Sequence, residues 1–82
     1  DFVTMSILDQ VIQTVAETLN VPSSSITQDS SAENTDAWDS LAQVNLMIAL
    51  EQTFDITLDV EDFMKLNSIS SIAAFIEENS EN

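Results

Sequence analysis

The stretch that decides the fold runs from residue 38 to residue 54 and reads WDSLAQVNLMIALEQTF. Asp39 is a suitable helix N-cap, because its carboxylate can accept a hydrogen bond from an N–H of the first turn. Apolar residues recur behind it at helical spacing and give the segment a broad apolar face: Leu41, Val44, Met47, Ile48 and Leu50. The stretch therefore predicts an amphipathic helix over residues 40–54.

A further helix is predicted before this stretch, from Ser6 to about Leu19. Ser6 suits the N-cap, and Asp9 follows three residues later in the style of a capping box. Asn20 can adopt the left-handed conformation that ends a helix, which matters in a chain without glycine. Pro22 then prevents continuation. The buried stripe of this helix is expected to contain Leu8, Val11, Ile12, Val15 and Leu19.

Two helices are predicted after residue 54. Asp59 caps a short one, with Asp62 three residues later and with Phe63 and Leu66 facing the core. Ser68 caps the last one, whose stripe contains Ile69, Ile72, Ala73 and Ile76 with Phe75 beside it. Between residues 54 and 58 apolar residues alternate as in a strand, but the chain offers no partner strand, and an extended loop is expected there.

Residues 23–39 form a long polar segment, which is unusual as a connection in a compact domain and often indicates function. Ile26 and Trp38 are expected to anchor its two ends in the core, so that Trp38 packs rather than stacks on a ligand. The fold class is therefore all-α. We expect a mostly antiparallel four-helix bundle with three longer helices, a short third helix and a long loop between the first two.

Composition excludes several classes of function. The 82 residues are 44% apolar, enough for one folded domain, yet they include fifteen Asp and Glu against the single Lys65. A formal charge of −14 opposes binding to nucleic acid and to anionic membranes. The absence of Cys and His removes disulfides, thiol catalysis, Ser-His triads and His-ligated metal sites. A self-contained enzyme is not expected. Lys65 is expected near the C-terminal end of the third helix, where its positive charge interacts favourably with the helix dipole.

Ser40 is the candidate site residue. A serine at a helix N-terminus lies at the positive end of the backbone dipole, where a phosphate ester on its hydroxyl is electrostatically favoured. Asp39-Ser40-Leu41 alone favours a plain helix cap over a modified serine, and the surrounding sequence has to decide between the two interpretations.

That context resembles the acyl carrier and peptidyl carrier protein family from about Ser6 to Glu78. The resemblance rests on Trp38-Asp39-Ser40-Leu41, on Val44 and Leu46, and on Ala49-Leu50-Glu51 and Phe54-Asp55-Ile56. The segment Leu19-Asn20-Val21-Pro22, with Ile26 after it, also resembles the opening of the family's fold. Length, acidity and the spacing of the four helices agree.

The resemblance implies a discrete, stand-alone carrier rather than an enzyme. Ser40 would receive a 4′-phosphopantetheine arm from coenzyme A, installed by a separate phosphopantetheinyl transferase that uses Mg²⁺. The thiol of the arm would hold an acyl or aminoacyl group as a thioester. Asp39 matches the family's aspartate that meets the basic surface of the transferase, and Leu41 matches the apolar residue that docks in it. No catalytic residue and no metal ligand is assigned.

Partners are expected to be enzymes with basic docking surfaces that load and transfer the cargo, because a strong negative field speeds encounter while affinity stays limited. Core positions Met47, Leu50, Phe54, Leu58, Phe63, Leu66 and Ile69 correspond in part to a cleft that shelters the acyl chain in the family. Aminoacyl carriers often leave their cargo exposed, so this second role of the core stays open.

The chain departs from carriers of bacterial fatty acid synthesis in its charge distribution. Its exposed positions on helix 40–54 are expected to be Ala42, Gln43, Asn45 and Gln52, with Glu51 as the only acid. The acids lie instead in the loop and around the third helix: Asp29, Glu33, Asp36, Asp55, Asp59, Glu61 and Asp62. This pattern, with Trp38 before the motif, favours a specialised polyketide, nonribosomal peptide or modified-lipid pathway.

Two other classes of function stay open. An acidic module or mimic could plug a basic cleft on a partner, with Ser40 unmodified, although this gives no reason for Asp39-Ser40-Leu41 after a long loop. A calcium module is the second, but the acids of residues 55–62 lack the spacing and the glycine of an EF-hand, so that only weak, diffuse cation binding and no specific site is expected.

Residues 1–4 are interpreted as a possible cloning remnant before Met5, residues 5–78 as the carrier domain, and residues 79–82 as a frayed acidic tail. No apolar run has the length of a membrane span, and a cytoplasmic monomer is expected.

Overall fold

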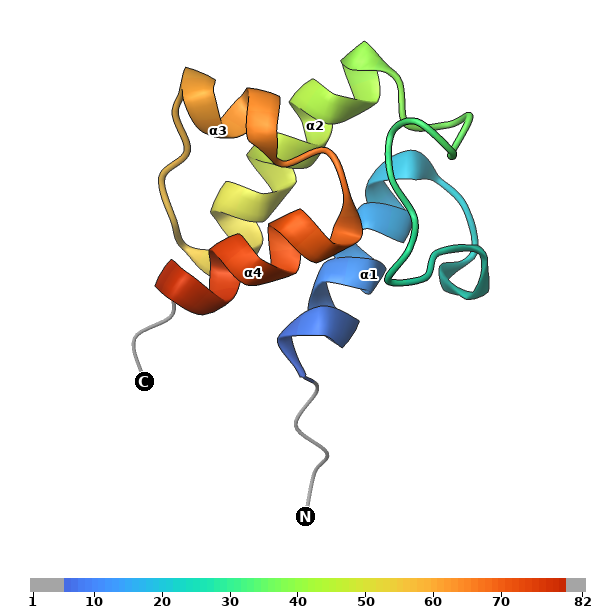
Figure 1. Cartoon of the computed structure of the whole chain (residues 1–82), viewed down its shortest axis with the longest axis horizontal. Coiled ribbons are helices and arrows are strands. Elements are labelled where there is room, and N and C mark those ends of the chain that lie inside the picture. Colours follow the sequence, from blue (N-terminus) through green and yellow to red (C-terminus); the bar gives the residue numbers. More distant parts are fainter. Residues whose placement is uncertain (1–5, 80–82) are drawn as a thin grey trace.

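The computed structural model describes residues 6–79 as an all-helical bundle (Figure 1). Its elements are α1 (Ile7–Leu19), a 3₁₀ turn η1 (Ser23–Ser25), α2 (Ser40–Phe54), α3 (Val60–Lys65) and α4 (Ile69–Asn79). The predicted fold class, with three longer helices, one short third helix and a long loop after the first helix, is confirmed. The interpretations of residues 1–4 and 80–82 lie outside the described residues.

Local sequence determines the helix ends. Ser6 Oγ accepts the N–H of Asp9 at 3.1 Å and caps α1, and Ser68 Oγ accepts the N–H of Ser71 at 3.2 Å and caps α4. The helices α1 and α2 end on left-handed residues, Asn20 at φ 61° and Asp55 at φ 56°. A side chain with a short polar group tolerates this conformation best after glycine, which the chain lacks.

The core lies where α1 packs against both α2 and α4 (Figure 1). Its fully buried side chains come from those three helices: Val11, Val15, Leu46, Leu50, Ile69 and Ile72. α3 packs against α2 and contains no fully buried residue, and Leu66 directly after it is buried. Phe54, Leu58 and Phe63, predicted as core, are partly buried and pack against the edge of this cluster.

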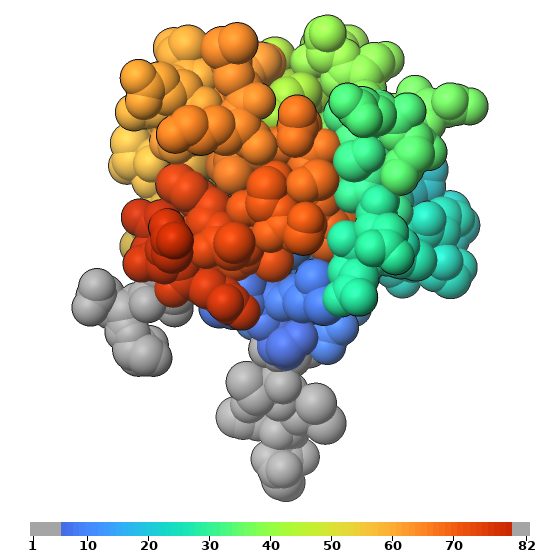
Figure 2. Space-filling view, viewed as in Figure 1, coloured from blue at the N-terminus to red at the C-terminus, as the bar shows by residue number. Residues whose placement is uncertain are grey.

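The long α1–α2 loop is fastened to the bundle at three places. Ile26 and Trp38 are buried, as predicted for its two ends. Between them, residues 30–32 run antiparallel to residues 67–69: Ala32 N–H donates to the Asn67 carbonyl at 2.9 Å, and Ile69 N–H to the Ser30 carbonyl at 3.0 Å. Figure 2 shows this loop lying alongside the start of α4. The loop therefore holds the N-terminus of α2 in a fixed position.

The helix α4 ends at Asn79, the first residue of the segment predicted as an acidic tail. It continues through Glu77 and Glu78 to Asn79, whose side-chain amide donates to the Phe75 carbonyl at 2.8 Å. Ile76 is buried in the preceding turn and anchors this end of the helix.

We expect the melting temperature to rise with sodium chloride. The chain has fifteen acidic residues and only one lysine, so its carboxylates repel each other in the compact state, and salt screens this repulsion. The molecule measures 37 × 29 × 19 Å, while the screening length falls from about 30 Å at 0.01 M salt to about 10 Å at 0.1 M. Thermal unfolding followed by circular dichroism at both concentrations tests this. A rise of roughly 4–8 °C corresponds to about 1 kcal/mol of relieved repulsion, and an unchanged melting temperature would contradict the prediction.

Candidate functional site

Ser40 is the first residue of α2 and is exposed. Asp39 before it is the N-cap, and its Oδ1 accepts the N–H of Ala42 at 2.9 Å. The predicted N-cap is confirmed, and this hydrogen bond holds the backbone of the first turn of α2 in place. The first turn of a helix has N–H groups without intrahelical acceptors, so the hydroxyl of Ser40 lies in a positive field that suits an attached phosphate.

Trp38 anchors this helix start from inside. Its indole is buried, and Nε1 donates to Gln43 Oε1 at 2.6 Å. Gln43 Nε2 donates in turn to two backbone carbonyls of the third helix region, Phe63 at 3.0 Å and Leu66 at 2.8 Å. The prediction that Trp38 is a packing anchor is confirmed.

The prediction that Gln43 is exposed was wrong. Gln43 is buried and lies on the same side of α2 as Leu46, Met47 and Leu50, at the spacing i, i+3, i+4 and i+7. This helical spacing is visible in the sequence, but Gln43 was assigned to the exposed side of the helix because its side chain is polar. Its three hydrogen bonds explain how the amide can be buried without an unsatisfied polar group.

The apolar residues that were predicted to form one side of this helix lie on two opposite sides of it. Met47 and Leu50 are buried, whereas Leu41, Val44 and Ile48 point away from the core. Leu41, next to Ser40, is 70% exposed. Because α2 carries apolar residues on opposite sides, periodicity alone could not tell which side the bundle covers.

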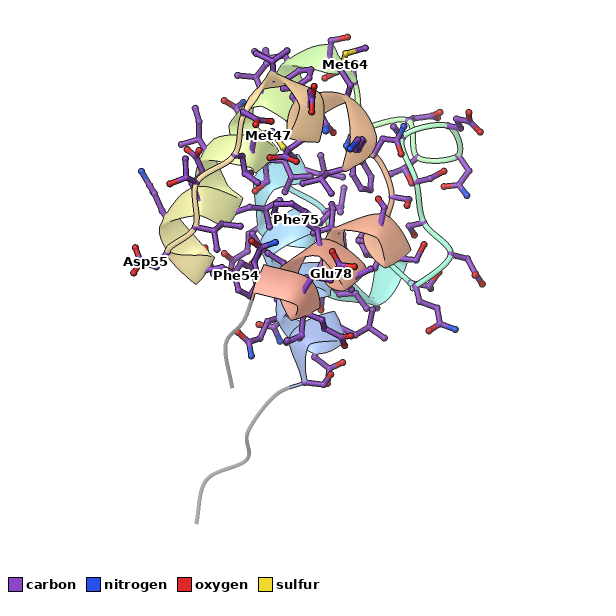
Figure 3. All side chains as sticks on the ribbon, turned by 60° about the vertical axis from the view of Figure 1, so that its left-hand side comes forward. Met47, Phe54, Asp55, Met64, Phe75 and Glu78 are labelled. Atoms are coloured by element: carbon purple, nitrogen blue, oxygen red, sulfur yellow. The ribbon has the colours of Figure 1, made fainter. Side chains whose placement is uncertain are left out.

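The exposed apolar residues of α2 continue onto α3, where Val60 is 77% and Met64 73% exposed. Figure 3 shows Met64 at the outer end of α3 and Met47 between α2 and α3. We call the five exposed residues Leu41, Val44, Ile48, Val60 and Met64 the apolar face. This face begins beside Ser40 and follows both helices.

Two cavities lie along the α2–α3 side. One of about 400 Å³ is next to Ser40 and is lined by Ala32, Trp38, Asp39, Ser40, Gln43, Phe63, Met64 and Asn67. The other, of about 580 Å³, lies between the two helices and is lined by Val44, Met47, Ile48, Glu51, Leu58, Asp59, Val60 and Phe63. Of the core positions considered for a cleft, Met47, Leu58 and Phe63 line this second cavity.

The acids near α3 hold the backbone in place. Asp59 and Asp62 form a reciprocal capping box, with both hydrogen bonds at 3.1 Å. Glu51, predicted as an exposed acid, is half-buried, and its Oε2 accepts the N–H of Leu58 at 2.8 Å. Within residues 6–79 no three acidic side chains are grouped as a metal ion would need. Lys65 lies in the last turn of α3, as predicted.

The site suits a covalently attached arm. The Ser40 hydroxyl is exposed at the helix start, a depression opens beside it, and an apolar cavity follows further along α2. An arm attached at Ser40 therefore has solvent on one side and apolar surface on the other. In residues 6–79 no helix combines the length and apolar character that a membrane crossing demands.

Comparison with known proteins agrees with this geometry. The family model described as "Phosphopantetheine attachment site" matches residues 9–76. An acyl carrier protein of Exiguobacterium sp. strain AT1b is 38% identical over 71 residues, which are 87% of this chain and 90% of that protein. Membership implies a covalently attached 4′-phosphopantetheine and interaction with a phosphopantetheinyl transferase and with acyl-handling enzymes. The chain belongs to the acyl carrier family of phosphopantetheine-binding proteins.

Proposed function

We propose that this protein holds an acyl or aminoacyl group as a thioester on a 4′-phosphopantetheine arm attached to Ser40, and that it catalyses no reaction itself. The observation that carries the proposal is the placement of Ser40. It is exposed, it opens α2 after a capping aspartate, and it lies inside the segment that matches the family.

The residues of this chain present the attachment point. Asp39 fixes the first turn, which presents the Ser40 hydroxyl to the active site of a transferase. There the hydroxyl oxygen attacks the pyrophosphate of coenzyme A, the P–O–P bond breaks, the phosphopantetheine arm stays on Ser40 as a phosphodiester, and adenosine 3′,5′-bisphosphate leaves. When attached, the arm supplies the thiol that forms the thioester. The chain has no cysteine, so it offers no competing thiol of its own.

The missing cysteine makes the test sharp. The wild-type protein is incubated with coenzyme A, Mg²⁺ and a broad-specificity phosphopantetheinyl transferase, and is then separated from free coenzyme A. Titration with a thiol reagent should rise from zero to one thiol per chain. A folded protein that stays at zero would contradict the proposal and would favour the acidic module that acts with Ser40 unmodified.

We propose that partners dock on the apolar face and meet the acids at its edges. Asp39 adjoins Leu41 at one end, and Asp59 and Glu61 adjoin Val60 on α3. A contiguous exposed apolar patch with charged residues around it is typical of an interaction site. The complementary partner surface is apolar with basic residues around it, and the positive charges steer the encounter.

Replacing Asp39 with Asn is expected to slow loading by a basic transferase about tenfold at low salt. Asn caps a helix as well as Asp does, so the fold should be kept and only the charge is lost. Loss of one charged partner at an interface costs about 1–3 kcal/mol, and 1.4 kcal/mol is a factor of ten.

The measurement is the initial loading rate, with Asp36→Asn as the control. Asp36 is exposed in the loop three residues earlier, so this variant removes the same charge away from the cap. Its rate should stay close to that of the wild type. Equal rates for Asp39→Asn and Asp36→Asn would contradict a direct role of Asp39 in docking.

We also propose that the protein is a cytoplasmic monomer that serves a specialised polyketide, nonribosomal peptide or modified-lipid pathway, and that it binds neither nucleic acid nor membranes. The surface of α2 supports this choice of pathway. Leu41, Val44 and Ile48 are exposed on it, and no acidic residue lies in its first turn, unlike the acidic helix expected of a carrier in bacterial fatty acid synthesis. Elongation assays with the housekeeping fatty acid enzymes test it. Little elongation is expected, and efficient cycles would overturn the proposal.

A further inference from the structure

Two methionines in residues 6–79 differ strongly in their exposure to solvent. Met64, on α3, is 73% exposed, whereas Met47, on α2, is 7% exposed and belongs to the core. Figure 3 shows Met47 between the two helices and Met64 at the outer end of α3. A hydroperoxide reaches a thioether sulfur from solvent, so exposure governs which methionine is oxidised first. Met64 should therefore react well before Met47.

The Met64 side chain can change its polarity without disturbing the core. It is neither one of the buried core side chains nor one of the partly buried apolar side chains packed against them. A polar group on Met64 therefore stays in solvent and costs the folded state little. The same group on Met47 would enter the core, where burial of an unpaired polar group is unfavourable.

Met64 lies where a change of polarity affects docking. It is one of the five residues of the apolar face, and it lines the cavity beside Ser40 together with Trp38 and Phe63. A thioether is a weak hydrogen-bond acceptor and loses little when a partner covers it. A sulfoxide oxygen is polar, and a partner surface that is apolar at this position leaves it without a donor. Oxidation of Met64 therefore opposes contact with such a surface.

The modification is a two-electron oxidation of the Met64 sulfur by a hydroperoxide. The sulfur lone pair attacks one peroxide oxygen, and the S–O bond forms as the O–O bond breaks. The proton of the transferred oxygen moves to the departing oxygen, so that hydrogen peroxide is reduced to water. A methionine sulfoxide reductase reverses the change, and a thiol reductant supplies the two electrons.

We propose that Met64 is a redox-sensitive modification site, where a hydroperoxide forms a sulfoxide that weakens docking of the partner enzymes and leaves the fold intact. This inference rests on the proposed docking of partners on the apolar face. Loading of the carrier is slowed while Met64 is oxidised, and reduction of the sulfoxide restores it.

The first part of the test follows the oxidation itself on the wild-type chain before it receives an arm. The chain has no cysteine, so its methionines are the only sulfur atoms that the peroxide meets. After treatment with hydrogen peroxide, peptide mass spectrometry measures the added oxygen at each methionine. Met64 should gain its oxygen about tenfold faster than Met47, with no change in melting temperature while Met47 is unmodified. Equal oxidation rates, or a lower melting temperature at that stage, would contradict the proposal.

The second part compares wild type, Met64→Leu and Met47→Leu. The readout is the initial loading rate of each treated protein divided by the rate of the same protein before treatment. The transferase is added after the peroxide has been removed, so that only the carrier is oxidised. We expect this ratio to fall about threefold or more in wild type and in Met47→Leu. It should stay near one in Met64→Leu, whatever the starting rate of that variant.

A ratio near one in wild type with Met64 fully oxidised would overturn the proposal, and so would an equal fall in Met64→Leu. If Met47→Leu does not fold, the comparison of wild type with Met64→Leu decides. Treatment of the oxidised wild type with methionine sulfoxide reductase and dithiothreitol should restore the loading rate. A rate that stays low after Met64 has lost its oxygen would contradict the proposal. An untreated wild type that gains no arm would instead contradict the attachment at Ser40.

Discussion

Replacement of Ser40 by alanine is expected to abolish attachment of the arm completely. The substitution removes the only atom that the proposal assigns to the phosphodiester, and no neighbouring side chain takes its place. It should leave the fold intact, because Ser40 is exposed and α2 is capped by Asp39 rather than by Ser40. The measurement is intact mass after incubation with coenzyme A, Mg²⁺ and the transferase.

The matched control for this variant is Ser70→Ala. Ser70 is also exposed in the first turn of a helix, as the second residue of α4, but it lacks the Asp39 and Leu41 neighbours. Its loading should equal that of the wild type. A modified Ser40→Ala protein would show that another residue accepts the arm.

Replacement of Leu50 by alanine is expected to lower the free energy of unfolding by about 3 kcal/mol, since Leu50 is 0% exposed and the cavity left behind cannot fully collapse. A domain of 82 residues has a total stability of only about 4–12 kcal/mol. The melting temperature should therefore fall by roughly 12–24 °C, which thermal unfolding by circular dichroism measures.

Ile48→Ala on the same helix is the control for Leu50→Ala. Ile48 is 49% exposed and faces away from the core, so its loss should cost less than about 1 kcal/mol. A comparable loss of unfolding free energy in both variants would contradict the packing of α2 through the side that contains Leu50.

Helix ends were predictable because they depend on a few adjacent residues. Ser6, Asn20, Asp39 and Asp59 each satisfy backbone groups within four positions of themselves, and the sequence pattern contains all the information needed. The same holds for the place of the candidate site, since Asp39, Ser40 and Leu41 are consecutive and lie at the predicted start of α2. Local chemistry thus accounts for both the caps and the site.

Features that depend on distant contacts were not predictable. Gln43 is buried because it bonds to carbonyls 20 and 23 residues away, and the loop is fastened because residues 30–32 meet residues 67–69. The sides of α2 could not be assigned either, because Leu41 and Leu50 are equally apolar and only the packing of α1 and α3 distinguishes them. Tertiary contacts decide such cases, and periodicity does not.

The most direct test of the central claim is to locate the arm on the wild-type protein. After loading, the intact chain is weighed and then fragmented in the mass spectrometer to find the modified residue. The proposal predicts one phosphopantetheinyl increment per chain, located on Ser40. An increment on any other residue, such as one of the serines of η1, or no increment on the folded protein, would contradict it.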